Sequence, residues 1–129
     1  MQWYTFLGGA GGDSAIAIQQ TSDGGYIVAG GASANIANLG GQTPLNAYSA
    51  SNDALVVKLT AAGAVQWYTF LGGAGSDSAT AIQQTSDGGY IVAGHAGANI
   101  ASLGGQTPLN AYTASSDILI IRLKSNGRL

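Results

Sequence analysis

The chain consists of one 64-residue segment that occurs twice. Residues 2–65 align with residues 66–129 without a gap, and 16 of the 64 aligned positions differ. The differences cluster near the end of the segment, where most of them are conservative. A fixed period of this length is typical of repeat architectures, in which each repeat is one supersecondary unit. The sequence therefore predicts two like units, residues 1–65 and residues 66–129.

Strand signals recur at matching places in both repeats. In the second repeat they cover residues 66–71, 78–83, 90–93 and 117–123, which are rich in β-branched, aromatic or alternating small and large side chains. Asp-Gly pairs at 23–24 and 87–88 predict hairpin turns whose two central residues accept positive φ. Helical periodicity is weak everywhere, with one short helical turn expected near residues 34–39 and 98–103. Each repeat is therefore expected to supply four antiparallel strands.

Four-stranded antiparallel sheets repeated in tandem predict an all-β fold, the β-propeller. In a propeller the sheets are blades, and their radial packing protects faces and edges that isolated sheets would expose. This chain would contribute two blades.

Composition excludes several classes of protein. The chain has no Cys, so zinc fingers, iron–sulfur sites, thiol enzymes and disulfide frameworks are excluded. Four basic residues and a formal net charge of -2 predict no nucleic-acid partner. No apolar run approaches the roughly 20 residues of a membrane helix, so no membrane partner is expected. A hydrophobic content of 46% disfavours intrinsic disorder.

A family pattern emerges from the spacing of particular residues. Residues 53–59 read D-A-L-V-V-K-L, and Gly63, Trp67, the Gly pair 72–73 and D-S-A at 77–79 follow. Residues 87–94 then read D-G-G-Y-I-V-A-G, and Q-T-P-L-N-A-Y at 106–112 precedes the last strand. Over nearly its whole length, and twice, the chain resembles the bacterial β-propeller repeat often called SBBP. The resemblance implies a propeller blade from a secreted or cell-surface parent, in a family mostly without an assigned activity.

The number of repeats departs from that family. Its members carry many more repeats, usually enough to close a ring in one chain, and often an export signal. This chain has two repeats and no recognisable signal peptide, so we expect an excised or engineered fragment.

Strand order predicts that the ring is completed by homo-oligomerisation. The chain starts with an outer strand that lacks a preceding third strand, and it finishes with a third strand that lacks an outer one. Head-to-tail contacts satisfy both, giving a homotrimer of six blades or a homotetramer of eight, with a compact dimer or an open array as alternatives. The expected assembly residues lie in these two strands: Gln2, Trp3, Tyr4, Phe6, Ile118, Ile120, Ile121 and Leu123.

Each residue that could take part in catalysis has a structural role that its sequence position predicts. The six Asp residues are three positions seen twice, at turns, after glycines and at strand starts, and no calcium-loop pattern occurs. His95 is the only imidazole, and its counterpart in the first repeat is Gly31. The glycine-rich segment 71–75 lacks the Lys and helix of a phosphate-binding loop. The sequence therefore predicts no enzyme, no cofactor and no metal site.

The long segments 31–52 and 95–116 are the remaining binding candidates, because loops longer than about 12–15 residues are often functional. They hold uncharged polar groups suited to a small neutral ligand or a glycan: Asn35, Gln42, Asn46, Tyr48, His95, Asn99, Gln106, Asn110 and Tyr112. The predicted function is a non-enzymatic, self-assembling scaffold or recognition module. The alternative is a multivalent carbohydrate-binding module that uses these loops or the exposed aromatic residues.

Overall fold

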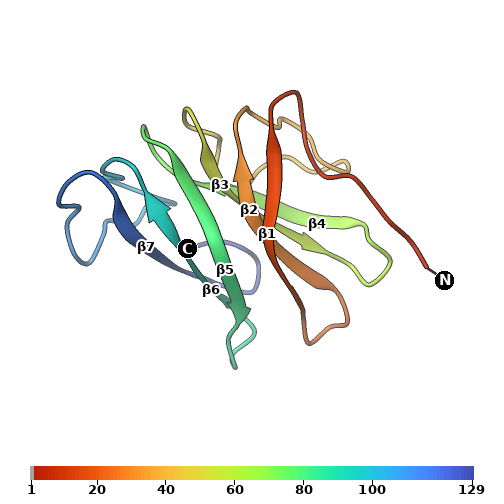
Figure 1. Cartoon of the computed structure of the whole chain (residues 1–129). Helices are drawn as coiled ribbons and strands as arrows, with labels where there is room; N and C mark the ends of the chain where they lie inside the picture. The colour runs from red at the N-terminus through yellow and green to blue at the C-terminus, as the bar shows by residue number, and fades with distance from the viewer. Residues whose placement is uncertain (1) are drawn as a thin grey trace.

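The computed structural model describes residues 2–129 as an all-β chain of two antiparallel sheets (Figure 1). The first sheet has the strand order β1-β2-β3-β4, and the second has the order β5-β6-β7. The strands are β1 (Asp13–Gln20), β2 (Tyr26–Ala32), β3 (Asp53–Leu59), β4 (Val65–Leu71), β5 (Asp77–Gln84), β6 (Tyr90–Ala96) and β7 (Asp117–Leu123). Among the described residues there is no helix, so the helical turns expected near 34–39 and 98–103 do not form. No helix long and apolar enough to cross a membrane is found there either.

The hairpins are built on one left-handed glycine each. In the β1–β2 hairpin, the amide of Gly24 donates to the carbonyl of Thr21 at 3.0 Å, and the amide of Thr21 donates to the carbonyl of Gly25 at 2.9 Å. Gly24 takes a φ of 83°, whereas Asp23 is not in the positive-φ region. This is a type I turn followed by a left-handed glycine, not the predicted turn with two positive φ values. The same bonds recur at residues 60–64, 85–89 and 124–128.

Strands β1 and β5 each lie so close to one position of the neighbouring strand that only glycine fits at that position. A Cβ on Gly94 of β6 would lie 1.8 Å from the carbonyl oxygen of Ser78 in β5, and a Cβ on Gly30 would lie 1.9 Å from that of Ser14. The register shifts at the same place, between Ala79 and Ala81 in the second sheet. The bulge and the glycine therefore belong together, which explains the small residues in this part of the repeat.

The sheet boundaries do not follow the repeat boundaries. β4 belongs almost wholly to the second repeat, yet it pairs with β3 and completes the first sheet. The far edge of β7 has no partner strand among residues 2–129. Residues 2–7, predicted as an outer strand that lacks a partner in its own chain, join no sheet in the described chain, and their pairing with another chain stays a prediction. The reason is that β3, which pairs with the equivalent segment of the second repeat, is already paired on both sides.

The two sheets pack against each other through faces that are not equivalent. We define the leading face as the side of each sheet that carries Ile27, Ala29, Ala54 and Val56 in the first sheet, and the trailing face as the opposite side. The leading face of the first sheet packs on the trailing face of the second, where Tyr90, Val92, Ile121 and Leu123 complete one core. The contact is therefore head-to-tail between two nearly identical units.

A second core covers the trailing face of the first sheet. Val28, Leu55 and Val57 form it together with Tyr68 and Phe70 of β4. Ile36 and Leu39 from the long loop between β2 and β3 close it, and Leu7 and Tyr48 pack at its margin. This loop therefore folds back on its own sheet.

Candidate functional site

The open ends of the molecule lie on opposite sides. Figure 1 shows β7 at one side of the pair of sheets and the N-terminal segment extending from the other. One open end is the leading face of the second sheet, with the free edge of β7. The other is the β1 side of the trailing face of the first sheet, where Ala15 and Ile18 are exposed, with residues 2–12 lying beside it. The predicted assembly residues lie at or near these two ends.

Two of the four assembly residues predicted on β7 point outward. Ile118 and Ile120 lie on the leading face of the second sheet and are 83% and 58% exposed. Ile121 and Leu123 alternate with them and are buried in the core between the sheets. The side chains of Ile121 and Leu123 therefore stabilise the chain itself, and only the backbone of β7 is open at those positions.

Residues equivalent to Ile118 and Ile120 show what such a surface contacts when it is covered. These are Ala54 and Val56 of β3, which are 1% and 0% exposed beneath the second sheet. Ile91 and Ala93, also on the open leading face, are half-buried, whereas their equivalents Ile27 and Ala29 are completely buried. The leading face is thus covered in one repeat and open in the other.

The N-terminal segment is already arranged against the first sheet as its equivalent is against the second. The rings of Trp3 and Tyr26 are 5.9 Å apart at 68°, and those of Trp67 and Tyr90 are 5.9 Å apart at 63°. Trp3 lies against Gly63, as Trp67 lies against Gly127. Trp3 also donates its indole N–H to the carbonyl of Ala61 at 3.1 Å.

The same correspondence continues along the segment to β1. Asp13 accepts a hydrogen bond from the amide of Gly9 at 2.9 Å, and Asp77 accepts one from the amide of Gly73 at 2.8 Å. Trp67 lies within the paired strand β4 and Gly73 follows that strand, whereas residues 2–7 have no partner strand among the described residues. Residues 2–12 therefore hold the position of an outer strand without the rest of its sheet.

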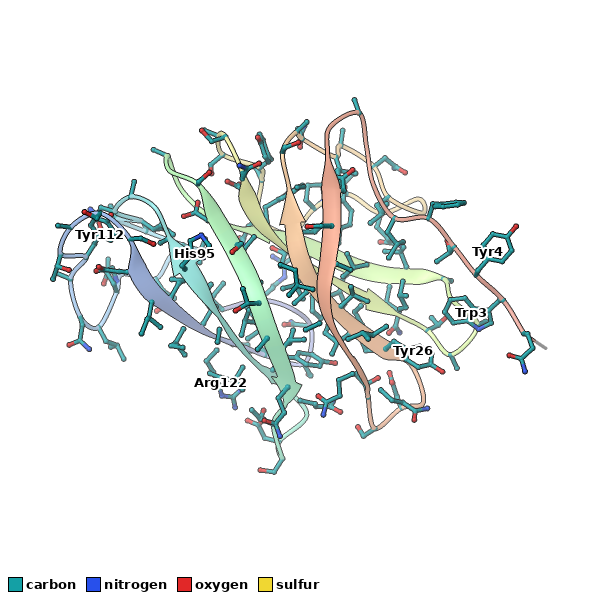
Figure 2. All side chains as sticks on the ribbon, viewed as in Figure 1. Trp3, Tyr4, Tyr26, His95, Tyr112 and Arg122 are labelled. Atoms are coloured by element: carbon teal, nitrogen blue, oxygen red, sulfur yellow. The ribbon has the colours of Figure 1, made fainter. Side chains whose placement is uncertain are left out.

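The aromatic residues of the two outer segments differ most in exposure. Tyr4 and Phe6 are 87% and 90% exposed, while Tyr68 and Phe70 are completely buried. Figure 2 shows Trp3 beside Tyr26, with Tyr4 turned away from both sheets. Gln2 is exposed as well.

The long loop of the first repeat completes the burial of β4. The amide of Leu45 donates to the carbonyl of Tyr68 at 3.0 Å, and the amide of Phe70 donates to the carbonyl of Asn46 at 3.2 Å. The hydroxyl of Tyr68 donates to the carbonyl of Ile36 at 2.6 Å. The rings of Tyr48 and Phe70 meet edge to face at 5.4 Å. The loop therefore adds a short extra edge to the first sheet.

The predicted loop residues differ in how far they are engaged by the protein itself. The backbone N–H of Asn46 donates to Thr69 Oγ1 at 3.1 Å, and the hydroxyl of Tyr48 donates to the carbonyl of Ser33 at 3.0 Å. In the second loop, Tyr112 likewise donates to the carbonyl of Ser115. The remaining predicted loop residues are exposed: Asn35, Gln42, Asn99, Gln106 and Asn110.

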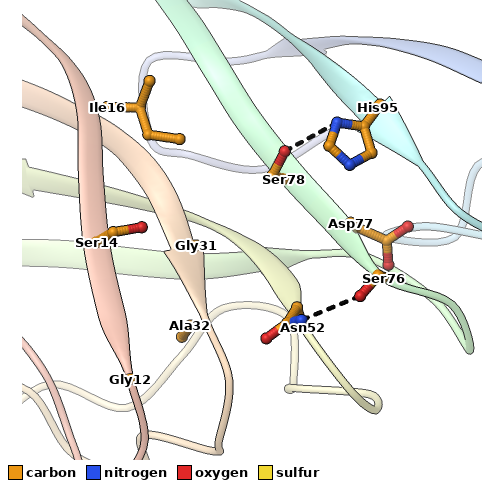
Figure 3. Close-up of a pocket in the computed structure, with 10 residues that line it drawn as sticks. All are labelled: Gly12, Ser14, Ile16, Gly31, Ala32, Asn52, Ser76, Asp77, Ser78 and His95. Carbon is orange, nitrogen blue, oxygen red and sulfur yellow. Dashed lines mark hydrogen bonds between the residues drawn. The ribbon is translucent and has the colours of Figure 1, made fainter.

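A cleft of about 200 Å³ lies between the starts of β1 and β5. Figure 3 shows Ser78 and His95 joined by a hydrogen bond, with 3.0 Å between Oγ and Nδ1, and Asn52 reaching Ser76 at 3.0 Å. His95, predicted as a loop residue, thus lies at the end of β6 beside β5.

The acid next to this pair is directed elsewhere. The carboxylate of Asp77 is buried and accepts hydrogen bonds from the amides of Gly73 at 2.8 Å and Gly97 at 3.3 Å. Burial raises the pKa of Asp77, and the nearby charge of Asp53 raises this pKa further, while the amide hydrogen bonds and the charge of His95 lower it. Among the described residues no carboxylate is hydrogen-bonded to the imidazole of His95, so the pair differs from a Ser-His-Asp triad, in which an Asp orients the histidine base.

A smaller cavity of about 80 Å³ marks the other open end, on the trailing face of the first sheet. Ala15, Val28 and Val57 line it beneath Leu7. Val28 and Val57 are buried in the second core, as their equivalents Val92 and Ile121 are in the first, whereas Ala15 is exposed and its equivalent Ala79 is buried beneath the first sheet. Sequence reasoning missed this surface, because the two repeats carry the same or similar apolar residues there, with Ile121 in the place of Val57.

Comparison with known proteins adds no relative. No protein-family model and no curated protein matches this chain.

Proposed function

We propose that this chain is a non-enzymatic scaffold that assembles with copies of itself into a closed β-propeller ring. In the ring, residues 2–7 of one chain add to the free edge of β7 of the preceding chain as a fourth strand. The leading face of each second sheet packs on the trailing face of the following first sheet. Three chains make six blades and four chains make eight.

One observation carries this proposal: apolar residues exposed at the open ends have equivalents that are covered within the chain. Exposed Tyr4, Phe6, Ile118 and Ile120 correspond to residues that are at most 1% exposed. Leu109 is fully exposed, whereas its equivalent Leu45 is half-buried beside β4. Burying one such side chain is worth about 1.5–3 kcal/mol, so the open ends together favour association.

The two ends are also complementary in kind. The leading face with a free edge lies at one end, and a trailing face with an unpaired strand segment lies at the other. Because they lie on opposite sides of the molecule, a second copy can satisfy them and the same chain cannot (Figure 1). The contact between the two sheets of one chain supplies the geometry for the contact between chains.

The resemblance to SBBP repeats supports the same proposal. In that family the blades of a ring are strung on one chain, and here they would be distributed over several. It also supports a secreted or cell-surface parent. The exposed loop residues would then be repeated around the ring, and the carbohydrate-binding alternative stays a prediction that a glycan-binding screen of the assembled ring tests.

Native mass spectrometry tests the proposal directly. A closed ring predicts a single species of three or four times the chain mass of 12.8 kDa. A ladder of masses would instead indicate an open array, and a dimer would indicate a compact alternative. A chain that stays monomeric at high concentration contradicts the proposed function.

A further inference from the structure

Two buried carboxylates face each other at the junction between the two sheets. Asp53, at the start of β3, and Asp77, at the start of β5, are 0% and 2% exposed. They flank Gly72: a Cβ on this glycine would lie 2.7 Å from Asp53 Oδ1 and 2.7 Å from Asp77 Oδ2. One carboxylate comes from each sheet, so packing of the sheets is what brings them together.

Polar contacts lock this junction in place. The amide of Asp77 donates to the carbonyl of Asn52 at 2.7 Å, which links β5 to the end of the first long loop. The hydroxyl of Ser49 lies 2.9 Å from both oxygens of Asp53 and donates to the carbonyl of Gly73 at 2.6 Å. No cation of Lys or Arg bonds to either carboxylate within residues 2–129, and His95 is the one basic group that acts on Asp77.

The equivalent carboxylates, Asp13 and Asp117, are apart in the single chain. Gly8 approaches Asp13 as Gly72 approaches Asp77, with 2.6 Å between a Cβ on Gly8 and Asp13 Oδ2, but Asp117 is not beside it. Asp117 is held by Thr113 as Asp53 is held by Ser49, with 2.8 Å from the Thr113 amide. Asp13 Oδ1 is buried without a hydrogen-bond partner.

We infer that ring closure is linked to protonation, because each junction between chains buries Asp13 of one chain against Asp117 of its neighbour. This inference rests on the proposed function. Desolvation and like charge both disfavour two ionised carboxylates at one site, so the assembled state binds a proton more tightly than the separate chains do.

The direction of the pH dependence follows from the junction within the chain. There the pKa of Asp77 is raised by burial and by the charge of Asp53. A carboxyl whose pKa is higher in the assembled state favours assembly as pH falls below that raised value. The gain is complete below the ordinary Asp value of about 3.9. Each proton taken up changes the association constant of a junction by at most about tenfold per pH unit.

Other titratable groups near the junction are few. His95 lies on the leading face of the second sheet at the position of Gly31. In the ring it would therefore face Asp13 of the next chain. An imidazole that gains a carboxylate partner also favours assembly at lower pH, so a variant must separate the two groups. Asp23 and Asp87 are engaged in their own hairpin turns, where hydrogen bonds hold the pKa of each well below its ordinary value.

The test is a concentration series by sedimentation velocity between about pH 4.5 and pH 8, a range in which ordinary isolated Asp carboxylates stay mostly ionised. We expect wild-type association to weaken steadily as pH rises. Asp13→Asn and Asp117→Asn remove the charge and keep one side-chain oxygen as a hydrogen-bond acceptor, and each is expected to associate more tightly at neutral pH and to lose most of the dependence. Asp53→Asn is the matched control within the chain and is expected to keep the dependence. Near-ultraviolet circular dichroism establishes that each variant is folded.

His95→Gly, which copies the first repeat, identifies the group that titrates. We expect this variant to retain the pH dependence, and its loss would assign the effect to the imidazole and overturn the inference. Equal association of the wild type at every pH overturns the inference and leaves the proposed function intact. Absence of association at every pH overturns the proposed function itself.

Discussion

Tyr68 and Tyr4 occupy equivalent positions in the two repeats, yet the first is completely buried and the second is 87% exposed. Val56 and Ile120 differ in the same way on the opposite side of the molecule, where a smaller side chain is buried and a larger one is open. Local sequence does not explain the difference, since the neighbours of Tyr4 and Tyr68 are identical and those of Val56 and Ile120 differ mainly by apolar-for-apolar and Lys-for-Arg exchanges. What differs is whether a further sheet packs against the side chain. The exposed fraction of these side chains therefore depends on the position of their sheet in the stack of sheets.

One exposed apolar residue lies outside this explanation. Ile16 of β1 lines the cleft between the sheets and is exposed, and its equivalent Thr80 is exposed as well. Because both copies are open, assembly does not account for Ile16.

The largest expected effects on stability and association come from truncating one aromatic residue in each repeat. Phe70→Ala removes a completely buried ring from the second core and is expected to lower the free energy of unfolding by about 3–5 kcal/mol. Phe6→Ala is expected to leave the folded single chain unchanged and to weaken association. Denaturant unfolding of dilute protein measures the first effect, and sedimentation measures the second. Equal destabilisation of the dilute chain by both variants would contradict the comparison.

A substitution within one sheet should instead act alike in both repeats. Gly30→Ala and Gly94→Ala each place a methyl group within 2 Å of a carbonyl oxygen on the neighbouring strand. We expect both to destabilise by about 1–3 kcal/mol, typical of overpacking, and to similar extents. Thermal unfolding of the two variants side by side checks this. A large difference between them would mean that the bulged strands are not equivalent.

The smallest expected effect concerns the two basic residues opposite the hairpin turns. Lys58 is buried and bonds Asp23 at 3.0 Å, the carbonyl of Leu59 at 3.0 Å and Gln66 at 2.9 Å. Its equivalent Arg122 is half-exposed and bonds Asp87. Lys58→Met is expected to cost about 1–3 kcal/mol. Arg122→Met is expected to cost at most about 1 kcal/mol, as for surface ion pairs.

The pH dependence of stability sharpens this pair of variants. Hydrogen bonds from Thr21, Gly25 and Lys58 hold the pKa of Asp23 far below its ordinary value of 3.8. A lowered pKa means stability that is present above the ordinary value and is lost as pH falls below it. Lys58→Met should make this acid-induced loss smaller, which unfolding curves between about pH 5 and pH 2 would measure. An unchanged loss would assign the lowered pKa to the turn alone.

Much of the fold follows from short-range signals in the sequence. The strand predicted over residues 117–123 has those bounds in the structure, and the predicted return strand at 90–93 is extended to Ala96. Alternation and turn glycines are sufficient for this, because the ladder and the hairpin depend on neighbouring residues. The predicted turn type was wrong. The Asp-Gly turns are type I turns followed by a glycine with positive φ, and an Asp-Gly pair does not by itself distinguish them from turns with two positive φ values.

The candidate site was predicted less completely. The backbone of Asn46 and the ring of Tyr48 contact β4, and ligand binding by the loops stays a prediction. The use of a loop as an edge for its own sheet depends on contacts between residues more than twenty positions apart. No local pattern distinguishes this from a binding loop, because both need polar and apolar groups in alternation.

The sequence by itself determined the period, the strands, the turns and the pairing of neighbouring strands, since each depends on residues close together in the chain. Only the tertiary structure decided which copy of each repeated residue is buried. Tyr4 and Tyr68 have equivalent places in the repeat, and so do Asp13 and Asp77. Which copy is buried depends on a neighbouring sheet, whose presence a linear pattern cannot specify. The packing of the two sheets against each other decides which copies are buried and which ends of the molecule are open.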